Sequence, residues 1–164
     1  CHARSIASRI DGACFWVAPK SPVIVLSLRL DRIDSFWFTF IHEVAHVINK
    51  DGNILDTDIV GEHAKEASEK PESELKANKF AVEYLVPQPA LSSFIARHQP
   101  LYTGAKIQAF AKLHKVHPGI VLGQLQYKGE TPWAYNRNLL VKVRHIVIEA
   151  ALTDGWGQTL PAAM

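Results

Sequence analysis

The sequence predicts a domain of the α+β class, in which a small antiparallel sheet precedes a set of helices. Three observations support this prediction. Two short β-rich runs stand close together near the amino terminus, a long apolar run with a helical pattern follows them, and apolar residues of the last third recur at helical spacing. With 164 residues, of which 48% are apolar and 21% charged, the chain can bury one core, and residues 1–153 are expected to form a single domain.

The first element expected is a β hairpin. The runs 13–18 and 23–30 are rich in β-branched and aromatic residues, and Pro19 and Pro22 mark a turn between them. Cys14 lies inside the first run and is expected to be a small buried filler. The two cysteines of the chain form neither a metal-type pair nor a disulfide framework.

The next element is a helix over residues 36–48, entered from residues 34–35 and ended by the Asp-Gly pair at 51–52. Almost every other position in it is apolar, which predicts a buried helix. This helix carries the sequence His-Glu-Val-Ala-His at residues 42–46. Because ionisable residues are rarely buried without a partner, three of them on one buried helix indicate a functional site.

The spacing of these residues is that of one half of a zinc peptidase site. Residues four apart lie on the same helix face, so His42 and His46 can direct ring nitrogens at one ion. Glu43 is turned by about 100° and reaches the open side of that ion. Zinc makes a bound water acidic, and Glu43 would take its proton as a peptide carbonyl is attacked. Two core histidines with a stray glutamate are the alternative interpretation.

A second helix, over residues 74–86, offers a third ligand. Its inward stripe consists of small and apolar residues, and Glu74 and Asn78 fall on the same stripe. A carboxylate there is costly unless it meets a metal, so Glu74 is the expected third ligand of a single zinc ion. Asn78, one turn later, is expected to hold the second nitrogen of a histidine in the required tautomer.

Two alternatives for this helix stay open. Glu72 is the rival ligand, expected in the loop that follows Pro71. Glu74 could also be no more than an acidic residue that the dipole favours at a helix N-terminus.

The remaining segments complete the expected domain. Residues 54–57 are expected to form a short edge strand, and residues 61–73 a mobile polar loop near the metal. Helices are expected over residues 106–116 and from His117-Pro118 onward. Residues 138–151 fit a helix or a strand, and the spacing of their apolar residues favours a helix. Two short helices with a tight joint also occur in DNA-binding domains, but basic residues are not concentrated on the second one.

Composition restricts the partners and the compartment. The net charge of +2 is too small to indicate nucleic-acid binding, and no direct nucleic-acid contact is expected. The chain has no apolar run of about 18 residues and no signal-peptide pattern, so a soluble cytoplasmic protein without a membrane partner is expected. Because the chain begins with Cys1 rather than methionine, we expect a fragment of a longer protein, and residues 154–164 are expected to be a flexible tail.

Together these motifs resemble the ImmA/IrrE family of zinc metallo-endopeptidases. Within it, the chain is most similar to the branch whose peptidase domain is joined to a HigA-like antitoxin helix-turn-helix. The resemblance covers roughly residues 10–145, and its matching segments are 12–16, 26–29, 36–46, 74–81, 85–87 and 107–126.

The resemblance implies a gluzincin-like α+β domain with zinc on His42, His46 and Glu74 and with Glu43 as the general base. Family members cut helix-turn-helix repressors or belong to toxin–antitoxin operons, so the implied partner is a repressor or an antitoxin. The branch usually carries a helix-turn-helix domain upstream, and such a domain is expected to be missing from this fragment. A non-proteolytic regulatory or antitoxin module, using the metal as scaffold or sensor, is the alternative function. The intact Glu43 favours the peptidase, because a scaffold needs ligands but no base.

Overall fold

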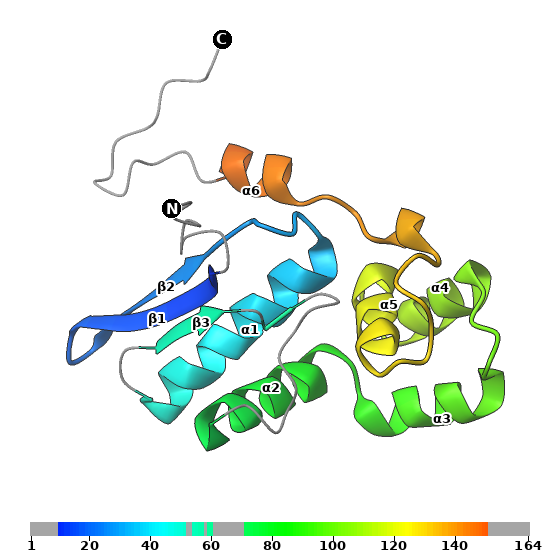
Figure 1. The fold of residues 1–164 in the computed structure, drawn as a ribbon, viewed down its shortest axis with the longest axis horizontal. Coiled ribbons are helices and arrows are strands. Elements are labelled where there is room, and N and C mark those ends of the chain that lie inside the picture. The colour runs from blue at the N-terminus through cyan, green and yellow to red at the C-terminus, as the bar shows by residue number, and fades with distance from the viewer. Residues whose placement is uncertain (1–9, 52–53, 58, 61–70, 151–164) are drawn as a thin grey trace, which may run out of the picture.

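The structure, a computed structural model, describes residues 10–51, 54–57, 59–60 and 71–150. A small sheet and a set of helices follow one another along the chain, which confirms the predicted α+β class (Figure 1). In chain order the elements are β1 (Ile10–Ala18), β2 (Ser21–Leu26), α1 (Ile33–Asn49), β3 (Ile54–Thr57), α2 (Glu72–Leu85), α3 (Gln88–His98), α4 (Gly104–Leu113), α5 (Pro118–Tyr127), the short 3-10 helix η3 (Arg137–Leu139) and α6 (Arg144–Ala150).

The sheet has three antiparallel strands in the order β2-β1-β3. The predicted hairpin is confirmed as β1 and β2, and the expected edge strand at 54–57 is β3. In the central strand, Gly12 stands opposite Leu26 on one side and Asp56 on the other. Cys14 is fully buried, as expected for a small filler.

Helix α1 is the central element, with the sheet on one side and α2 and α5 on another (Figure 1). It begins at Ile33 rather than Phe36, because Asp34 lies in the first turn, where the helix dipole favours an acidic side chain. It ends at Asn49. The left-handed backbone of Lys50 (φ 59°) then turns the chain back, so that the N–H of Asp51 donates to the carbonyl of His46 at 3.1 Å. The turn brings Asp51 beside the last turn of the helix.

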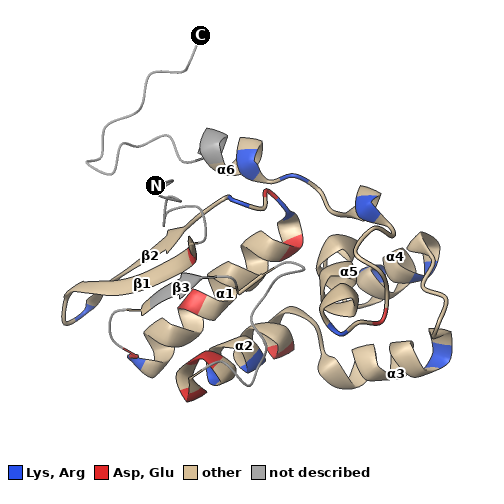
Figure 2. Ribbon diagram, viewed as in Figure 1, with Lys and Arg blue, Asp and Glu red and all other residues tan. Residues whose placement is uncertain are grey.

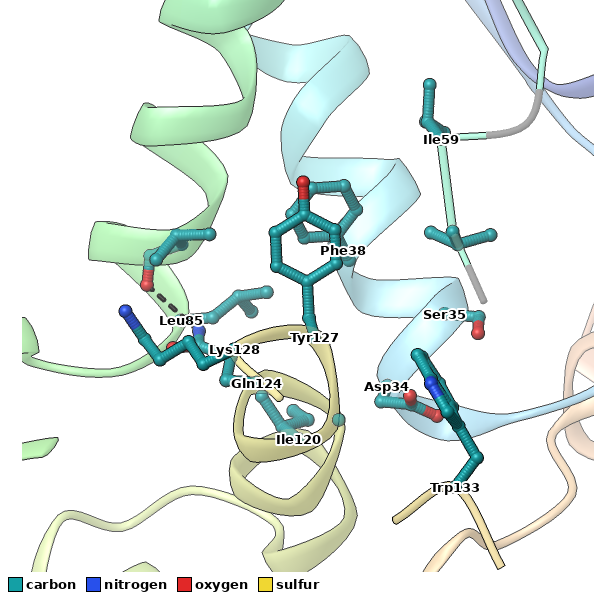
Figure 3. Close-up of a pocket in the computed structure, with 13 residues that line it drawn as sticks. Asp34, Ser35, Phe38, Ile59, Leu85, Ile120, Gln124, Tyr127, Lys128 and Trp133 are labelled. Atoms are coloured by element: carbon teal, nitrogen blue, oxygen red, sulfur yellow. Dashed lines mark hydrogen bonds between the residues drawn. The ribbon is translucent and has the colours of Figure 1, made fainter. Parts of the chain in front are cut away.

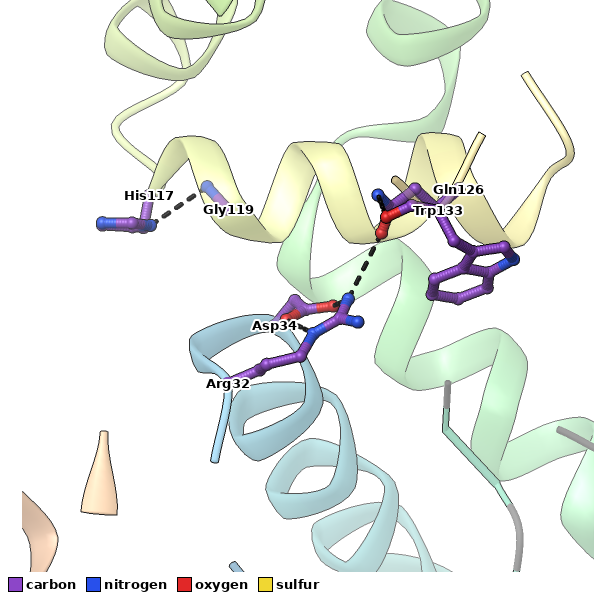
Figure 4. Close-up of polar contacts among 6 residues, drawn as sticks. All are labelled: Arg32, Asp34, His117, Gly119, Gln126 and Trp133. Carbon is purple, nitrogen blue, oxygen red and sulfur yellow. Dashed lines mark hydrogen bonds and ion pairs between the residues drawn. The ribbon is translucent and has the colours of Figure 1, made fainter. Parts of the chain in front are cut away.

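Arg32 joins the start of α1 to the end of α5 (Figure 4). Its guanidinium donates to both carboxylate oxygens of Asp34 at 3.0 and 2.6 Å, and to Oε1 of Gln126 at 3.3 Å. The same group lies 5.5 Å from the ring centre of Trp133, a cation–π contact. These contacts tie the start of α1 to the end of α5 and to Trp133.

Helix α2 is longer at its start than the sequence predicted, because it begins at Glu72 and not at Glu74. Of the polar loop expected at 61–73, residues 61–70 lie outside the described part of the chain. The far end of α2 is held by two glutamines: Gln88 donates to the carbonyl of Val86 at 2.8 Å, and Gln124 donates to that of Val82 at 3.0 Å. These amides satisfy carbonyls that the end of the helix leaves exposed.

Helix α3 was not predicted. Its apolar positions Leu91, Phe94 and Ile95 do have helical spacing, and a proline stands in its first turn, where the missing N–H costs nothing. The surrounding serines and the flanking prolines obscure this short signal. Leu91 and Phe94 enter the main core together with residues from α1, α2, α4 and α5.

The two later helices are confirmed as α4 and α5, and the ring nitrogen Nδ1 of His117 accepts the N–H of Gly119 at 3.0 Å, capping α5. The segment 138–151 is neither one helix nor one strand, because it divides into η3 and α6. Asp31 explains the division. Its carboxylate accepts the backbone N–H groups of Arg144 and Val143 at 2.7 and 3.0 Å, which starts α6. The hydrogen bond from Arg144 is also the main reason why the pKa of Asp31 lies below its ordinary value.

Charged residues are distributed unevenly over the fold (Figure 2). Lys and Arg are scattered over the ends of several elements, whereas Asp and Glu include a group at the N-terminal end of α2 beside α1. Helix α5 carries seven buried residues out of ten, so packing accounts for its apolar pattern. Within the described residues, none of the helices is long and apolar enough to cross a bilayer.

Candidate metal centre

His42, His46 and Glu74 come together where α1 packs against the first turn of α2. The two histidines are fully buried and Glu74 is largely so, with 13% of its side chain exposed. Helical spacing places both imidazoles on the face of α1 that meets α2. The antiparallel packing of the two helices then places the start of α2 opposite the end of α1.

The donor atoms of these residues form a close triangle. Nε2 of His42 and Nε2 of His46 are 3.0 Å apart, and the Glu74 carboxylate lies 3.3 Å from the first and 3.2 Å from the second. Ligand atoms on a tetrahedral zinc with bonds of about 2.0–2.1 Å are separated by about 3.3 Å. Two imidazoles and one carboxylate are also the donor set of catalytic zinc sites that keep one position open. The residues therefore fit a single divalent metal ion.

Glu72, the rival ligand, lies away from this group. Its side chain is 80% exposed and its carboxylate accepts a hydrogen bond from Lys76 at 2.8 Å, one turn along α2. That hydrogen bond holds the pKa of the Glu72 carboxyl below its ordinary value. Glu74 is the glutamate of this helix that faces the histidines.

Asp51 is a contributor that the sequence did not reveal. Its Oδ2 lies 2.9 Å from Nδ1 of His46, so the carboxylate can accept a proton held there and leave Nε2 with a lone pair toward the metal position. Asp51 was interpreted only as a helix stop. The left-handed turn at Lys50 that returns it to the histidine has no signal of its own, because lysine rarely adopts that conformation.

Asn78 was expected to take this orienting part. Its Oδ1 is buried but accepts no hydrogen bond from the described residues, so the histidine contact expected of it is not formed there. The orienting role of Asn78 stays a prediction, and Asp51 is the residue whose geometry fits it.

We expect Asp51→Ala to lower zinc affinity by about 10- to 100-fold, the usual loss when the partner of a ligand histidine is removed. A competition titration against a chromophoric chelator measures this loss. Asn78→Ala is the companion variant, and the structure predicts the smaller effect for it. A normal affinity in Asp51→Ala, with a weakened one in Asn78→Ala, would return the orienting role to Asn78.

Glu43 faces the sheet. It is fully buried, and a side-chain carbon added at Gly12 of β1 would overlap its carboxylate. The same added carbon would lie 2.8 Å from the methyl group of Thr39, one turn earlier on α1. The absence of a side chain at Gly12 thus leaves space in the sheet for the Glu43 carboxylate. The residue pattern of the strand does not reveal this close approach.

For this reason Gly12→Ala is expected to cost about 1–3 kcal/mol of unfolding free energy, as overpacking does, because Glu43 or the strand must move. Chemical denaturation followed by circular dichroism measures the loss. Gly104→Ala is the matched control, since the nearest atom to its added carbon is the Asn136 Oδ1 at 3.4 Å. Equal stability of the two variants would show that the contact at Gly12 relaxes without cost.

The family model described as the IrrE N-terminal-like domain, a peptidase family, matches residues 3–123. The chain belongs to this family. The matched segment runs from before β1 into α5, so it contains the two helices that carry the donor triangle. Searches of curated proteins and of solved structures returned no significant match.

Membership of the IrrE N-terminal-like family supports a metallopeptidase-type function and agrees with the family expected from the motifs. It also agrees with the donor geometry, which was established from the side chains alone.

Proposed function

We propose that the protein is a zinc-dependent endopeptidase that cleaves one specific protein partner, a helix-turn-helix repressor or an antitoxin. The observation that carries the proposal is the triangle of two buried imidazoles and the Glu74 carboxylate, with Glu43 on the same helix as the two histidines. A metal kept only as a scaffold needs the three donors but no neighbouring base. Membership of a peptidase family supports the same class of reaction.

In this proposal the residues of the metal centre have separate roles. His42, His46 and Glu74 hold the metal, which when bound supplies Lewis acidity for the scissile carbonyl. Asp51 fixes the ring of His46 through its Nδ1 atom. Glu43 accepts the proton of the attacking water at a carboxylate oxygen and passes it to the amine that leaves.

The proposed substrate is an exposed, extended segment of a folded protein. Strand β3 stands at the end of the sheet order and follows directly on the helix that carries the histidines. An edge strand presents backbone donors and acceptors to which an extended peptide can add as a further strand. Binding of this kind selects a partner that presents a loop, so casein and short generic peptides should be poor substrates.

The proposal is tested by mapping new N-termini in a cell lysate treated with the zinc-loaded protein. One or a few new termini, all abolished by a chelator and restored by zinc, are expected. Rapid digestion of many denatured proteins would contradict the single-partner proposal, because an open cleft would need no particular partner. Absence of any metal-dependent terminus would favour the non-proteolytic alternative.

A further inference from the structure

A pocket opens between α1, α2 and α5 (Figure 3). Its volume is about 120 Å³, and its wall is mainly apolar. The apolar side chains that form it include Phe38, Ile59, Val82, Leu85, Ile120 and Trp133. A cavity of about 150 Å³ with such a lining accepts a benzene ring, so this pocket has the size for one aromatic or branched side chain.

The pocket lies along the same helix seam as the metal donors. Phe38 precedes His42 by one turn of α1, and the centres of the two rings are 6.0 Å apart. One helical turn is about 5.4 Å, so the nearer wall stands about one side-chain length from the donors. Neighbouring residues of a peptide are 3.8 Å apart. A residue beside a bond held at the metal can therefore place its side chain in the pocket.

The walls of this pocket are fixed by polar contacts behind them. Asp11, only 3% exposed, accepts the N–H of Ile59 at 2.9 Å while it is paired with Arg29 at 2.7 Å. On the opposite wall, the hydrogen bond from Gln124 to the carbonyl of Val82 ties α5 to α2. A pocket held in this way exists before a ligand arrives, which lowers the ordering cost of binding.

Tyr127, at the end of α5, also lines the pocket, and it is 51% exposed (Figure 3). With Phe38 and Trp133 it gives the lining three aromatic residues, so a bound aromatic side chain would leave water for an aromatic environment. A charged side chain would lose hydration in this mainly apolar pocket, where the carboxylate of Asp34 is already bonded to Arg32 and the amide of Gln124 to the carbonyl of Val82.

From these features we infer that the pocket is the specificity site of the peptidase and takes a bulky apolar side chain adjacent to the scissile bond. The inference rests on the proposed function, since it supplies the substrate class for that reaction. Substrates with phenylalanine or leucine beside the cleaved bond bind best, and substrates with alanine or aspartate there bind worst. The Kd values of these two groups are expected to differ by at least about 10-fold, as they do when ligands differ by methylene groups that fill an apolar pocket.

The test uses N-acetyl amino-acid hydroxamates, whose hydroxamate group binds the metal without any cleavage. Calorimetry on the zinc-loaded protein gives the Kd for the phenylalanine, leucine, alanine and aspartate derivatives and for acetohydroxamate. Val82→Phe fills the pocket and should remove the preference for phenylalanine and leucine while leaving acetohydroxamate binding near wild type. Val141→Phe is the matched control, because Val141 is exposed and does not line the pocket. It should keep the full preference.

The outcomes separate the two proposals. If acetohydroxamate binds but all four derivatives bind equally, the pocket is not a specificity site, and the metal site stands. If no hydroxamate binds and no zinc is retained, both proposals fail together. Should Val82→Phe not fold, Tyr127→Ala provides the second variant: it is expected to weaken phenylalanine binding several-fold, and an unchanged preference would overturn the inference.

Discussion

Glu74→Ala is expected to strip the protein of metal. The substitution removes one of three donors and leaves the two buried imidazoles, whose Nε2 atoms are 3.0 Å apart, as the remaining pair. A lost ligand costs more than the 10- to 100-fold given for the loss of a supporting residue, so we expect zinc affinity to fall by more than about 100-fold. Elemental analysis of protein purified without added zinc, and a competition titration, measure the effect.

Glu72→Ala is the control, because it removes the same side chain two residues earlier on the same helix. Glu72 is exposed and paired with Lys76, away from the histidines, so its loss should leave the metal content unchanged. Circular dichroism shows whether α2 is retained in both variants. Metal loss in Glu72→Ala with normal content in Glu74→Ala would refute the ligand assignment.

The second large effect is expected for Glu43→Gln, which should abolish cleavage while the metal stays bound. The amide has nearly the shape of the carboxylate and fits the space that Gly12 leaves, but it cannot take a proton from the attacking water. General-base catalysis contributes about 10²- to 10⁴-fold, and a loss in that range is expected for the cleavage rate. Single-turnover cleavage of the partner, with metal content measured in parallel, tests this expectation.

A glutamate on the outer face of α2 supplies the matched control. Glu83 is exposed, 56% by side-chain area, and its nearest ion-pair partner is Lys79 at 4.0 Å. Glu83→Gln should cleave like the wild type. Full activity in Glu43→Gln would assign the base to another residue, and an unchanged biological effect without any cleavage would support the regulatory module.

Two kinds of feature could be predicted from the sequence: elements with a periodic residue pattern, and ligand side chains whose burial is costly without a partner. His42 and His46 lie on the same face of α1 however the helix packs, because residues four apart are about one helical turn apart. Glu74 could be selected over Glu72 because it falls on the inward stripe, where an acidic residue needs a partner. The hairpin and the edge strand could be predicted because their turn and strand residues are local signals.

What could not be predicted depends on single backbone conformations and on contacts distant in sequence. The return of Asp51 to His46 depends on one left-handed lysine, and the room for Glu43 depends on which residue of β1 faces it. The capping of α6 by Asp31 joins positions more than a hundred residues apart in the chain. No periodicity encodes such contacts. The apolar spacing of the segment 138–151 favoured a helix but did not show that the segment divides into η3 and α6.

The donors of the metal site belong to two separate helices, and this makes metal binding and helix docking one equilibrium. Unfolding separates the start of α2 from α1 and dismantles the triangle, so an ion that binds only the folded chain adds to its stability by mass action. At a free metal concentration of 100 times the Kd the gain is about 2.7 kcal/mol, a large fraction of the stability of a domain this size. The melting temperature of this protein should therefore rise with free zinc, and a cell that withholds the metal would lower the amount of folded protein as well as its activity.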